Sequence, residues 1–261
     1  PYSYAVPDDL FPTEITVTDL DGRVVRTVAD LPLRDDVPTA FDAVAPGPRS
    51  VGWRADAPAT LTWVEALDGG DIRREAEFRD RVFMQAAPFT AEPVKLIDLK
   101  ERYAGIVWGE YDGAIANRRW FNTRHETRFA VDPSHPGQGR VLLERNYQAR
   151  YDNPGQPVTQ PNAAGRSTIR FTPDGKILMS GAGATPQGEF PFLAAMDPAT
   201  GRSERLWTSA DTDYEAVVGF LDADGKRVVT QRETRLDPPN LQIRDLATRQ
   251  KKRPAEIPRP A

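Results

Sequence analysis

Few side chains in this sequence could act as catalytic nucleophiles or bases. The only histidines, His125 and His135, lie in the polar stretches NTRHET and DPSHPG, which favours a solvated surface position for both. A catalytic serine needs a neighbouring base and, in α/β-hydrolases, the G-x-S-x-G turn that exposes its hydroxyl. Ser167 in GRSTI has only the leading glycine of that motif. The sequence therefore predicts no Ser-His-Asp triad, and we expect these 261 residues alone to be catalytically inactive.

Metal and cofactor sites are also not predicted. The chain has no cysteine, which excludes disulfides and thiolate metal sites. The glycine-rich stretch GAGATPQG at residues 181–188 lacks the Lys-Ser/Thr ending of a phosphate-binding loop. TPDGK at 172–176 and DADGK at 222–226 lack the spacing of a calcium loop, so they indicate tight turns. We expect no cofactor and no metal.

One stretch, NRRWFNTRHETR, concentrates positive charge around two aromatic residues. Its arginines are Arg118, Arg119, Arg124 and Arg128. Guanidinium groups pair with carboxylates in a fixed fork, so the stretch could form an electropositive face for an acidic side chain. The alternative is an outer strand and its turn that are simply solvated by arginine. The sequence alone leaves both interpretations open.

Composition sets the class of protein. Hydrophobic residues make up 39% of the chain, which is enough for a packed core, and the 24 prolines favour short strands joined by turns over helices. The net charge of -4 gives no reason to expect nucleic acid or an anionic membrane as a partner. No apolar run is long enough to span a bilayer, and no signal peptide is visible. We expect a soluble segment, cytoplasmic, periplasmic or secreted, excised from a longer chain because it starts at Pro1 without methionine.

The elements that would position these residues are predicted to be β-strands. Strand-favouring runs between Asp, Gly and Pro recur along the chain. They lie at residues 2–6, 14–19, 23–28, 50–54, 60–66, 80–86, 93–99, 104–110, 113–121, 127–132, 140–144, 168–172, 176–180, 192–197, 203–207, 215–221, 226–231 and 241–245. A polar, proline-rich stretch at residues 146–165 is predicted to be a long surface loop.

The strands group into repeats. Aligned first strands put Trp53, Trp108, Phe171 and Phe220 in register as core aromatics, 49 to 63 residues apart. Four strands per unit and a period near fifty are typical of propeller blades. The predicted fold is all-β, a partial or compact β-propeller of four-stranded antiparallel blades, with about three complete blades and partial blades at both ends. The predicted blade boundaries lie near residues 30–48, 100–103, 146–166 and 208–213.

Several long strings resemble one peptidase family. They are GPRSVGWRADAPATLTWVEALDGGD, WFNTR at 120–124, SGAGATPQGEFPFL at 180–193, DLDGRVVRTVADLPL and DPPNLQIRDL. Together they are similar to the propeller region of the glutamyl endopeptidase branch of the prolyl oligopeptidase family of serine peptidases. The resemblance implies a C-terminal α/β-hydrolase domain in the parent chain, which would carry the catalytic Ser, Asp and His and act as partner of this segment. It also implies cleavage of peptides after glutamate, with the propeller capping the active site and admitting only flexible peptides.

The resemblance makes Arg119 and Arg124 the candidate contacts to an acidic peptide substrate. The turn between the second and third strands of a blade shares a face with the connections between blades, and Arg124 falls in such a turn. Asn122 departs from the W-[FY]-K-T-R pattern, where a lysine is expected. The competing interpretation is a non-catalytic propeller that binds protein or glycan ligands through loops such as residues 146–165.

Overall fold

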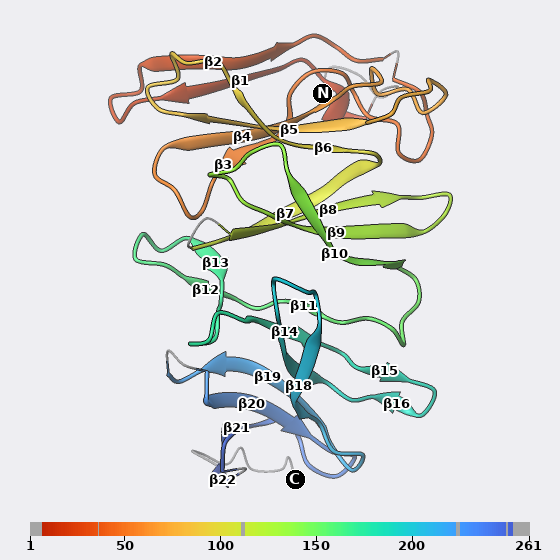
Figure 1. Ribbon diagram of the computed structural model, residues 1–261, viewed down its shortest axis with the longest axis vertical. Coiled ribbons are helices and arrows are strands. Elements are labelled where there is room, and N and C mark those ends of the chain that lie inside the picture. Colours follow the sequence, from red (N-terminus) through yellow and green to blue (C-terminus); the bar gives the residue numbers. More distant parts are fainter. Residues whose placement is uncertain (1–6, 36, 111–112, 223–224, 249, 253–261) are drawn as a thin grey trace. The chain divides into compact units, whose positions relative to one another are not determined.

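The regular structure of the chain is almost entirely β-strand. The computed structural model describes residues 7–35, 37–110, 113–222, 225–248 and 250–252. Within them the one helical element is a short 3₁₀ turn, η1 (Asp8–Leu10) (Figure 1). The prediction of an all-β partial propeller of four-stranded antiparallel blades is confirmed. The strand expected at residues 2–6 lies outside the described residues.

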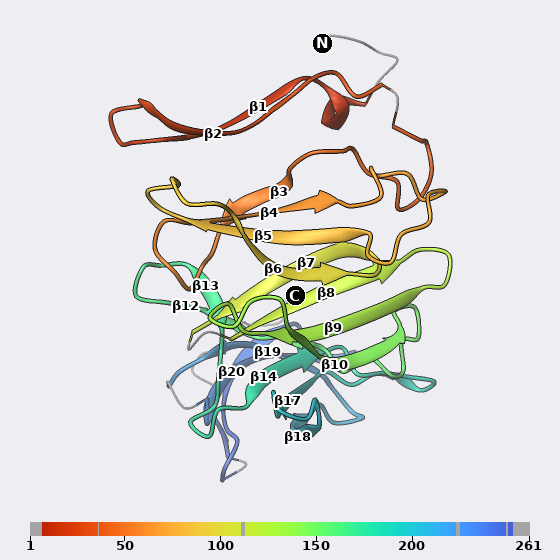
Figure 2. The same cartoon turned by 45° about the horizontal axis from the view of Figure 1, so that its top comes forward.

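The first of two compact units, Pro1–Glu144, consists of a hairpin and two sheets in successive layers (Figure 2). The hairpin pairs β1 (Thr13–Thr18) with β2 (Val24–Leu31). The first sheet has the order β3 (Arg49–Trp53), β4 (Thr60–Ala66), β5 (Asp80–Ala86) and β6 (Val94–Leu99). The second sheet runs in the order β10 (Gly139–Asn146), β9 (His125–Val131), β8 (Gly113–Trp120) and β7 (Arg102–Gly109).

The first sheet buries both of its faces. On one side Leu61 and Trp63 of β4 form a cluster with Val17 and Val28 of the hairpin. The other side forms the main core with the second sheet. That core contains Val64, Val82, Met84, Leu96, Ile97, Leu99, Trp108, Ala114, Ala116, Phe129 and Val131. The first five residues of β4 are accordingly all buried, polar and apolar alike, and the strand shows little alternation.

The second unit, Arg145–Ala261, contains two further four-stranded sheets. The third sheet has the order β11 (Gln156–Pro157), β14 (Ile177–Gly181), β17 (Phe192–Met196) and β18 (Ser203–Thr208). The fourth has the order β19 (Tyr214–Phe220), β20 (Arg227–Glu233), β21 (Asn240–Asp245) and β22 (Lys251–Lys252). Leu178, Leu193 and Val228 form the core between these two sheets. Two short hairpins add β12 (Thr159–Pro161) with β13 (Ser167–Ile169), and β15 (Ala184–Thr185) with β16 (Gly188–Glu189).

The structure corrects the predicted first strand of the third sheet. Residues 146–165 are not only a loop, because they contribute β11 as an edge strand beside β14, and β12. The strand expected at 168–172 is shorter and pairs with β12, while Phe171 makes only an isolated bridge to Ile177. Proline lacks the N–H that a central strand needs, but it is tolerated at a sheet edge. Pro157 and Pro161 therefore hid two edge strands.

Trp53 is also not the core aromatic that was predicted. Its side chain is 45% exposed and lies at a tilt to the Phe89 ring, with the ring centroids 6.2 Å apart. Trp63, on the adjacent strand, is buried in its place. The two strands of this stretch were predicted correctly, but the burial of Trp53 was predicted wrongly.

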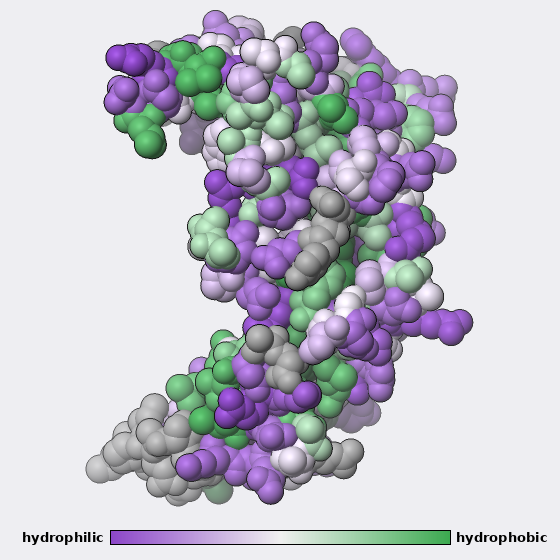
Figure 3. Space-filling view, turned by 60° about the vertical axis from the view of Figure 1, so that its left-hand side comes forward, coloured by the Kyte–Doolittle hydropathy of each residue, from purple (hydrophilic) through white to green (hydrophobic). Residues whose placement is uncertain are grey.

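Both hydrophilic and apolar side chains reach the surface. In the space-filling view, hydrophilic residues cover most of the visible face of the first unit, and apolar residues gather on the visible face of the second unit (Figure 3). Exposed apolar side chains of the second unit include Leu206, Tyr214, Val218, Leu221 and Leu241. An exposed apolar patch on a soluble protein is typical of an interaction surface.

Candidate functional site at the β8–β9 turn

The arginine-rich stretch forms a hairpin whose turn lies at residues 121–124. Trp120 ends β8 and pairs with His125, the first residue of β9. The Arg124 N–H donates to the Phe121 carbonyl at 3.2 Å, and Arg124 has a positive φ of 57°. Asn122 and Thr123 are exposed at the tip. The turn therefore presents a short polar tip whose two ends are anchored by aromatic and guanidinium groups.

Phe121 lies between two planar groups. The Phe41 ring stacks on it with a centroid distance of 3.5 Å and an interplanar angle of 12°. The Arg124 guanidinium carbon is 3.6 Å from the same centroid, and its Nη1 donates to the Phe121 carbonyl at 2.7 Å. Two groups this close to one ring must lie on opposite faces, because they would overlap on the same face. Stacking on the ring, through a cation–π contact, orients the Arg124 guanidinium.

Asp42 attaches this turn to the rest of the unit. Its Oδ2 accepts the Phe121 N–H at 2.7 Å, and its backbone carbonyl accepts Arg102 Nε at 2.6 Å. Asp42 has a positive φ of 63°, a conformation that Asp tolerates better than most residues. The segment that carries Phe41 is thus hydrogen-bonded to both the turn and the start of β7.

A buried ion cluster lies behind Asp42. Arg102 binds both oxygens of Asp68, at 2.9 and 2.8 Å, and Asp80 at 2.9 Å. Arg79 also binds Asp68, at 2.7 Å, and Arg49 binds Asp80. Burial acts to raise the pKa of Asp68, but hydrogen bonds from Arg102 and Arg79 outweigh it and hold the pKa below its ordinary value. Asp68 is therefore an ionised structural partner of these arginines.

Arg119 is the more exposed member of a second ion cluster. Its guanidinium binds the buried Glu126 with Nε at 2.8 Å and Nη2 at 2.6 Å. Glu126 also accepts Arg128 Nε at 2.9 Å. Burial acts to raise the pKa of Glu126, but the two guanidinium groups lower it overall. Arg119, with its side chain 47% exposed, is the member of this cluster that reaches the surface.

His125 is held by a carboxylate, contrary to the prediction of a merely solvated histidine. Its Nδ1 lies 2.8 and 3.0 Å from the two carboxylate oxygens of Glu101. Arg118 lies 3.4 Å from the same carboxylate. Because Glu101 lies 24 residues earlier in the chain, no local sequence pattern indicates this contact. The pair fixes the imidazole beside the turn.

The second histidine belongs to a small Ser-His-Asp group that cannot act as a triad. Asp132 Oδ2 lies 2.7 Å from His135 Nδ1, and Ser134 Oγ lies 3.1 Å from the same nitrogen. A triad needs the acid and the serine on different ring nitrogens, so that the acid orients the ring while the histidine takes the proton of the serine hydroxyl. The hydrogen bonds of Ser134 and His135 lower the pKa of Asp132 to about 2. The Asp132, Ser134 and His135 side chains hydrogen-bond to one another within a turn of an exposed loop.

The predicted site residues are thus accounted for individually. Arg119 and Arg124 lie at the same end of the β8–β9 hairpin, and their role as substrate contacts stays a prediction. The interpretation of a solvated outer strand is wrong, since β8 and β9 are inner strands of the second sheet and Arg128 is buried. Sequence reasoning missed the acidic partners around this hairpin. Glu101 pairs with Arg118, and Glu126 pairs with Arg119 and Arg128. Asp42 holds the turn through the Phe121 N–H, and Asp68 and Asp80 pair with Arg102 behind it.

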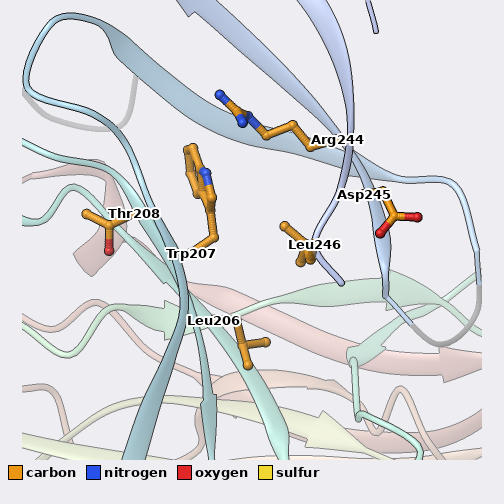
Figure 4. Close-up of a pocket in the computed structure, with 6 residues that line it drawn as sticks. All are labelled: Leu206, Trp207, Thr208, Arg244, Asp245 and Leu246. Carbon is orange, nitrogen blue, oxygen red and sulfur yellow. The ribbon is translucent and has the colours of Figure 1, made fainter. Parts of the chain in front are cut away.

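The second unit has a pocket of about 350 Å³ between β18 and the end of β21 (Figure 4). Trp207 and Arg244 point toward one another across it, with the guanidinium carbon 5.6 Å from the ring centroid. Arg244 Nε also binds the buried Glu215 at 2.5 Å, so its charge is compensated inside the protein. The cationic Arg244 guanidinium and the Trp207 ring of the pocket are therefore already in contact with each other.

The described residues contain neither a cluster of metal-ligating side chains nor a membrane-spanning helix. No group of three or more histidine, aspartate or glutamate side chains in this part of the chain is arranged to hold a metal ion. No helix in the same residues is long and apolar enough to cross a membrane.

The sequence is similar to two known plant proteins. A protein of Arabidopsis thaliana named "Probable glutamyl endopeptidase, chloroplastic" is 37% identical over 254 residues, which is 91% of this chain and 26% of its own length. Its namesake in Oryza sativa subsp. japonica is 36% identical over 91% of this chain and 27% of its own length. The chain thus spans about a quarter of the length of these relatives. No family model matches the sequence.

Solved structures are more distant. A puromycin-hydrolyzing peptidase of Mycobacterium tuberculosis has a TM-score of 0.40 and 17% identity, covering 90% of this chain and 31% of that chain. The assignment therefore rests on the two plant relatives, which match along nearly the whole chain. On that basis, this partial β-propeller is similar, along nearly its whole length, to about a quarter of two plant proteins named glutamyl endopeptidase.

Proposed function

We propose that this chain is the substrate-gating propeller segment of a serine endopeptidase that cleaves peptides after glutamate. The single observation that carries the proposal is 37% identity along 91% of the chain to a protein that bears the glutamyl endopeptidase name. Because the match takes up only 26% of that relative, the remaining length has room for a catalytic domain. The proposed partner is an α/β-hydrolase domain of the same polypeptide, and the proposed ligand is a peptide.

The proposed contacts to the acidic substrate are Arg124 and Arg119. Guanidinium groups bind carboxylates in a planar fork, and a guanidinium that is already stacked loses less freedom on binding. The stacking of Arg124 on Phe121 and the exposure of the Arg119 guanidinium support this assignment. Both features favour a negatively charged side chain over a neutral one of the same size.

The test is a kinetic comparison in the full-length protein. Arg124→Ala is expected to raise KM for a glutamyl peptide about tenfold, as loss of one charge-assisted contact predicts, with little change in kcat. A matched glutaminyl peptide should be much less affected. Arg23→Ala is the control, because Arg23 is an exposed arginine on the β1–β2 turn, beside Asp21, and loses the same charge.

The substrate contact and the peptidase activity can be contradicted separately. If the full-length protein cleaves glutamyl peptides and Arg124→Ala has unchanged kinetics, the substrate contact is wrong while the peptidase assignment stands. If the full-length protein hydrolyses no glutamyl peptide, the proposed activity itself is wrong.

A further inference from the structure

Phe41 is a large apolar residue that the fold leaves at the surface of the first unit. It is 67% exposed, although its ring stacks on Phe121 of the β8–β9 turn. One face of the ring therefore contacts the protein, and the other faces solvent. Exposed aromatic rings next to arginine side chains are frequent at binding surfaces, because they supply a large contact area.

Hydrogen bonds hold the backbone next to Phe41. The carboxylate of Asp42 accepts a bond from the β8–β9 turn, and its carbonyl accepts one from Arg102. Two residues further on, the Val44 N–H donates to the Gly70 carbonyl at 3.1 Å. A group that is already ordered loses less conformational freedom on binding, and an aromatic side chain has only two torsions to fix. Phe41 is thus a pre-organised contact and not the tip of a free loop.

Phe41 and Arg124 are the outer members of one stack. They lie on opposite faces of Phe121, with the Phe41 ring at 3.5 Å and the Arg124 guanidinium carbon at 3.6 Å from its centroid. The two outer groups are therefore about 7 Å apart. In an extended peptide, alternate side chains point to the same side and are also about 7 Å apart, because each residue advances the chain by about 3.3 Å. The stack thus matches the spacing of residues i and i+2 of an extended peptide.

We propose that Phe41 is a specificity-determining residue, which contacts a large apolar side chain two positions from the glutamate of an extended peptide substrate. The inference rests on the proposed function, in which Arg124 binds the glutamate carboxylate, and adds a second requirement to it. The two outer groups of the stack are chemically complementary to such a pair. A guanidinium binds a carboxylate in its own plane, and a phenyl ring packs against an aromatic or aliphatic side chain.

The test is the cleavage of a set of glutamyl peptides by the full-length protein. The peptides carry phenylalanine or alanine one or two positions before or after the glutamate. At one of the two positions that lie two residues away, we expect kcat/KM to be about tenfold higher with phenylalanine than with alanine, mainly through KM. Phe41→Ala should reduce this ratio to less than about twofold, and Phe41→Tyr, which keeps the ring, should preserve it. Neighbours of the glutamate should show no dependence on Phe41, because their side chains point to the other side of the peptide.

Two further variants separate the contacts. Arg124→Ala should reduce the discrimination between glutamyl and glutaminyl peptides and retain the preference for phenylalanine over alanine. Phe41→Ala should do the reverse. Leu20→Ala is the matched control, because it removes another exposed apolar side chain, on the β1–β2 turn, and should change neither ratio.

The outcomes distinguish this inference from the proposed function. If the full-length protein cleaves glutamyl peptides but the wild type has no such phenylalanine preference, or Phe41→Ala leaves the preference intact, Phe41 does not determine specificity and the glutamyl endopeptidase proposal stands. A full-length protein that hydrolyses no glutamyl peptide would overturn both. Because the wild-type ratio alone can contradict the inference, a Phe41→Ala variant that fails to fold does not leave the question open.

Discussion

Glu126 is the residue on which the charge balance of the β8–β9 hairpin depends. It is almost fully buried and pairs with both Arg119 and the buried Arg128. Glu126→Gln keeps the shape of the side chain but removes the carboxylate charge that faces Arg119 and the buried Arg128. Removal of one partner from a buried ion pair costs about 3–5 kcal/mol. We expect a loss of that size in the free energy of unfolding, measured by urea titration with tryptophan fluorescence.

Acid titration tests the cause of that loss. Because the folded pKa of Glu126 is lowered, its ion pairs stabilise the fold fully above the unfolded pKa of about 4.3 and lose their effect as pH falls through the folded value. The stability difference between the wild type and Glu126→Gln should therefore shrink on acidification. Glu144→Gln, an exposed carboxylate 3.8 Å from Arg118, should change stability by less than about 0.5 kcal/mol. A pH-independent deficit in Glu126→Gln would point to packing instead.

At the scale of elements, the connection between β4 and β5 depends on Gly70. The Gly70 N–H donates to Asp68 Oδ1 at 2.9 Å, and its carbonyl accepts the Val44 N–H at 3.1 Å. Its φ is +81°, and a Cβ there would overlap the Val44 carbonyl. Gly70→Ala should therefore destabilise the protein, because it combines an unfavourable φ with a backbone clash.

Gly22 separates these two effects. It has nearly the same φ, +82°, but a Cβ there would meet nothing within 4 Å. Gly22→Ala should cost only the conformational term of about 1–2 kcal/mol, and Gly70→Ala should cost about 1–3 kcal/mol more. Thermal or urea unfolding of the two variants gives the difference directly. Equal losses would show that the Val44 segment moves aside without cost.

At the scale of the whole molecule, the propeller segment should be unable to hydrolyse peptides alone. The sequence has no G-x-S-x-G motif, and the one Ser-His-Asp group in the described residues, around His135, places both partners on one ring nitrogen. Incubation of the 261-residue chain with a glutamyl peptide should therefore give no product by mass spectrometry. Cleavage that survives Ser134→Ala would require a site elsewhere in the chain, and cleavage lost in that variant would contradict the geometric argument.

The strands themselves were predictable from the sequence. Asp, Gly and Pro punctuate the chain wherever a strand turns, and the hairpin signal at Asp21 and Gly22 correctly joins β1 to β2. The prolines around residues 156–161 had the opposite effect, because they concealed the edge strands β11 and β12. An edge strand of two or three residues is defined by the strand it pairs with, so its own sequence carries little signal.

The candidate site was predictable only in part. Arg119 and Arg124 stand out because they lie in one basic, aromatic stretch. The contacts that hold the neighbouring residues of the turn are harder to find: Glu101 meets His125 across 24 residues, and Asp42 meets Phe121 across 79. Composition shows that acidic residues exist, but tertiary pairing decides which arginines they neutralise. Charge patterns in sequence therefore overstate the positive potential of a folded surface.

The buried cluster of Arg102, Asp68, Asp80 and Arg79 also limits how this family can evolve. Replacing any one member leaves another ionised group in the interior without its partner, whereas apolar replacement of a whole set can be nearly neutral. The effects of substitutions at these positions are therefore strongly non-additive. Natural drift should retain the cluster intact or lose it as a block, so these four positions, drawn from three separate parts of the chain, should change together during descent.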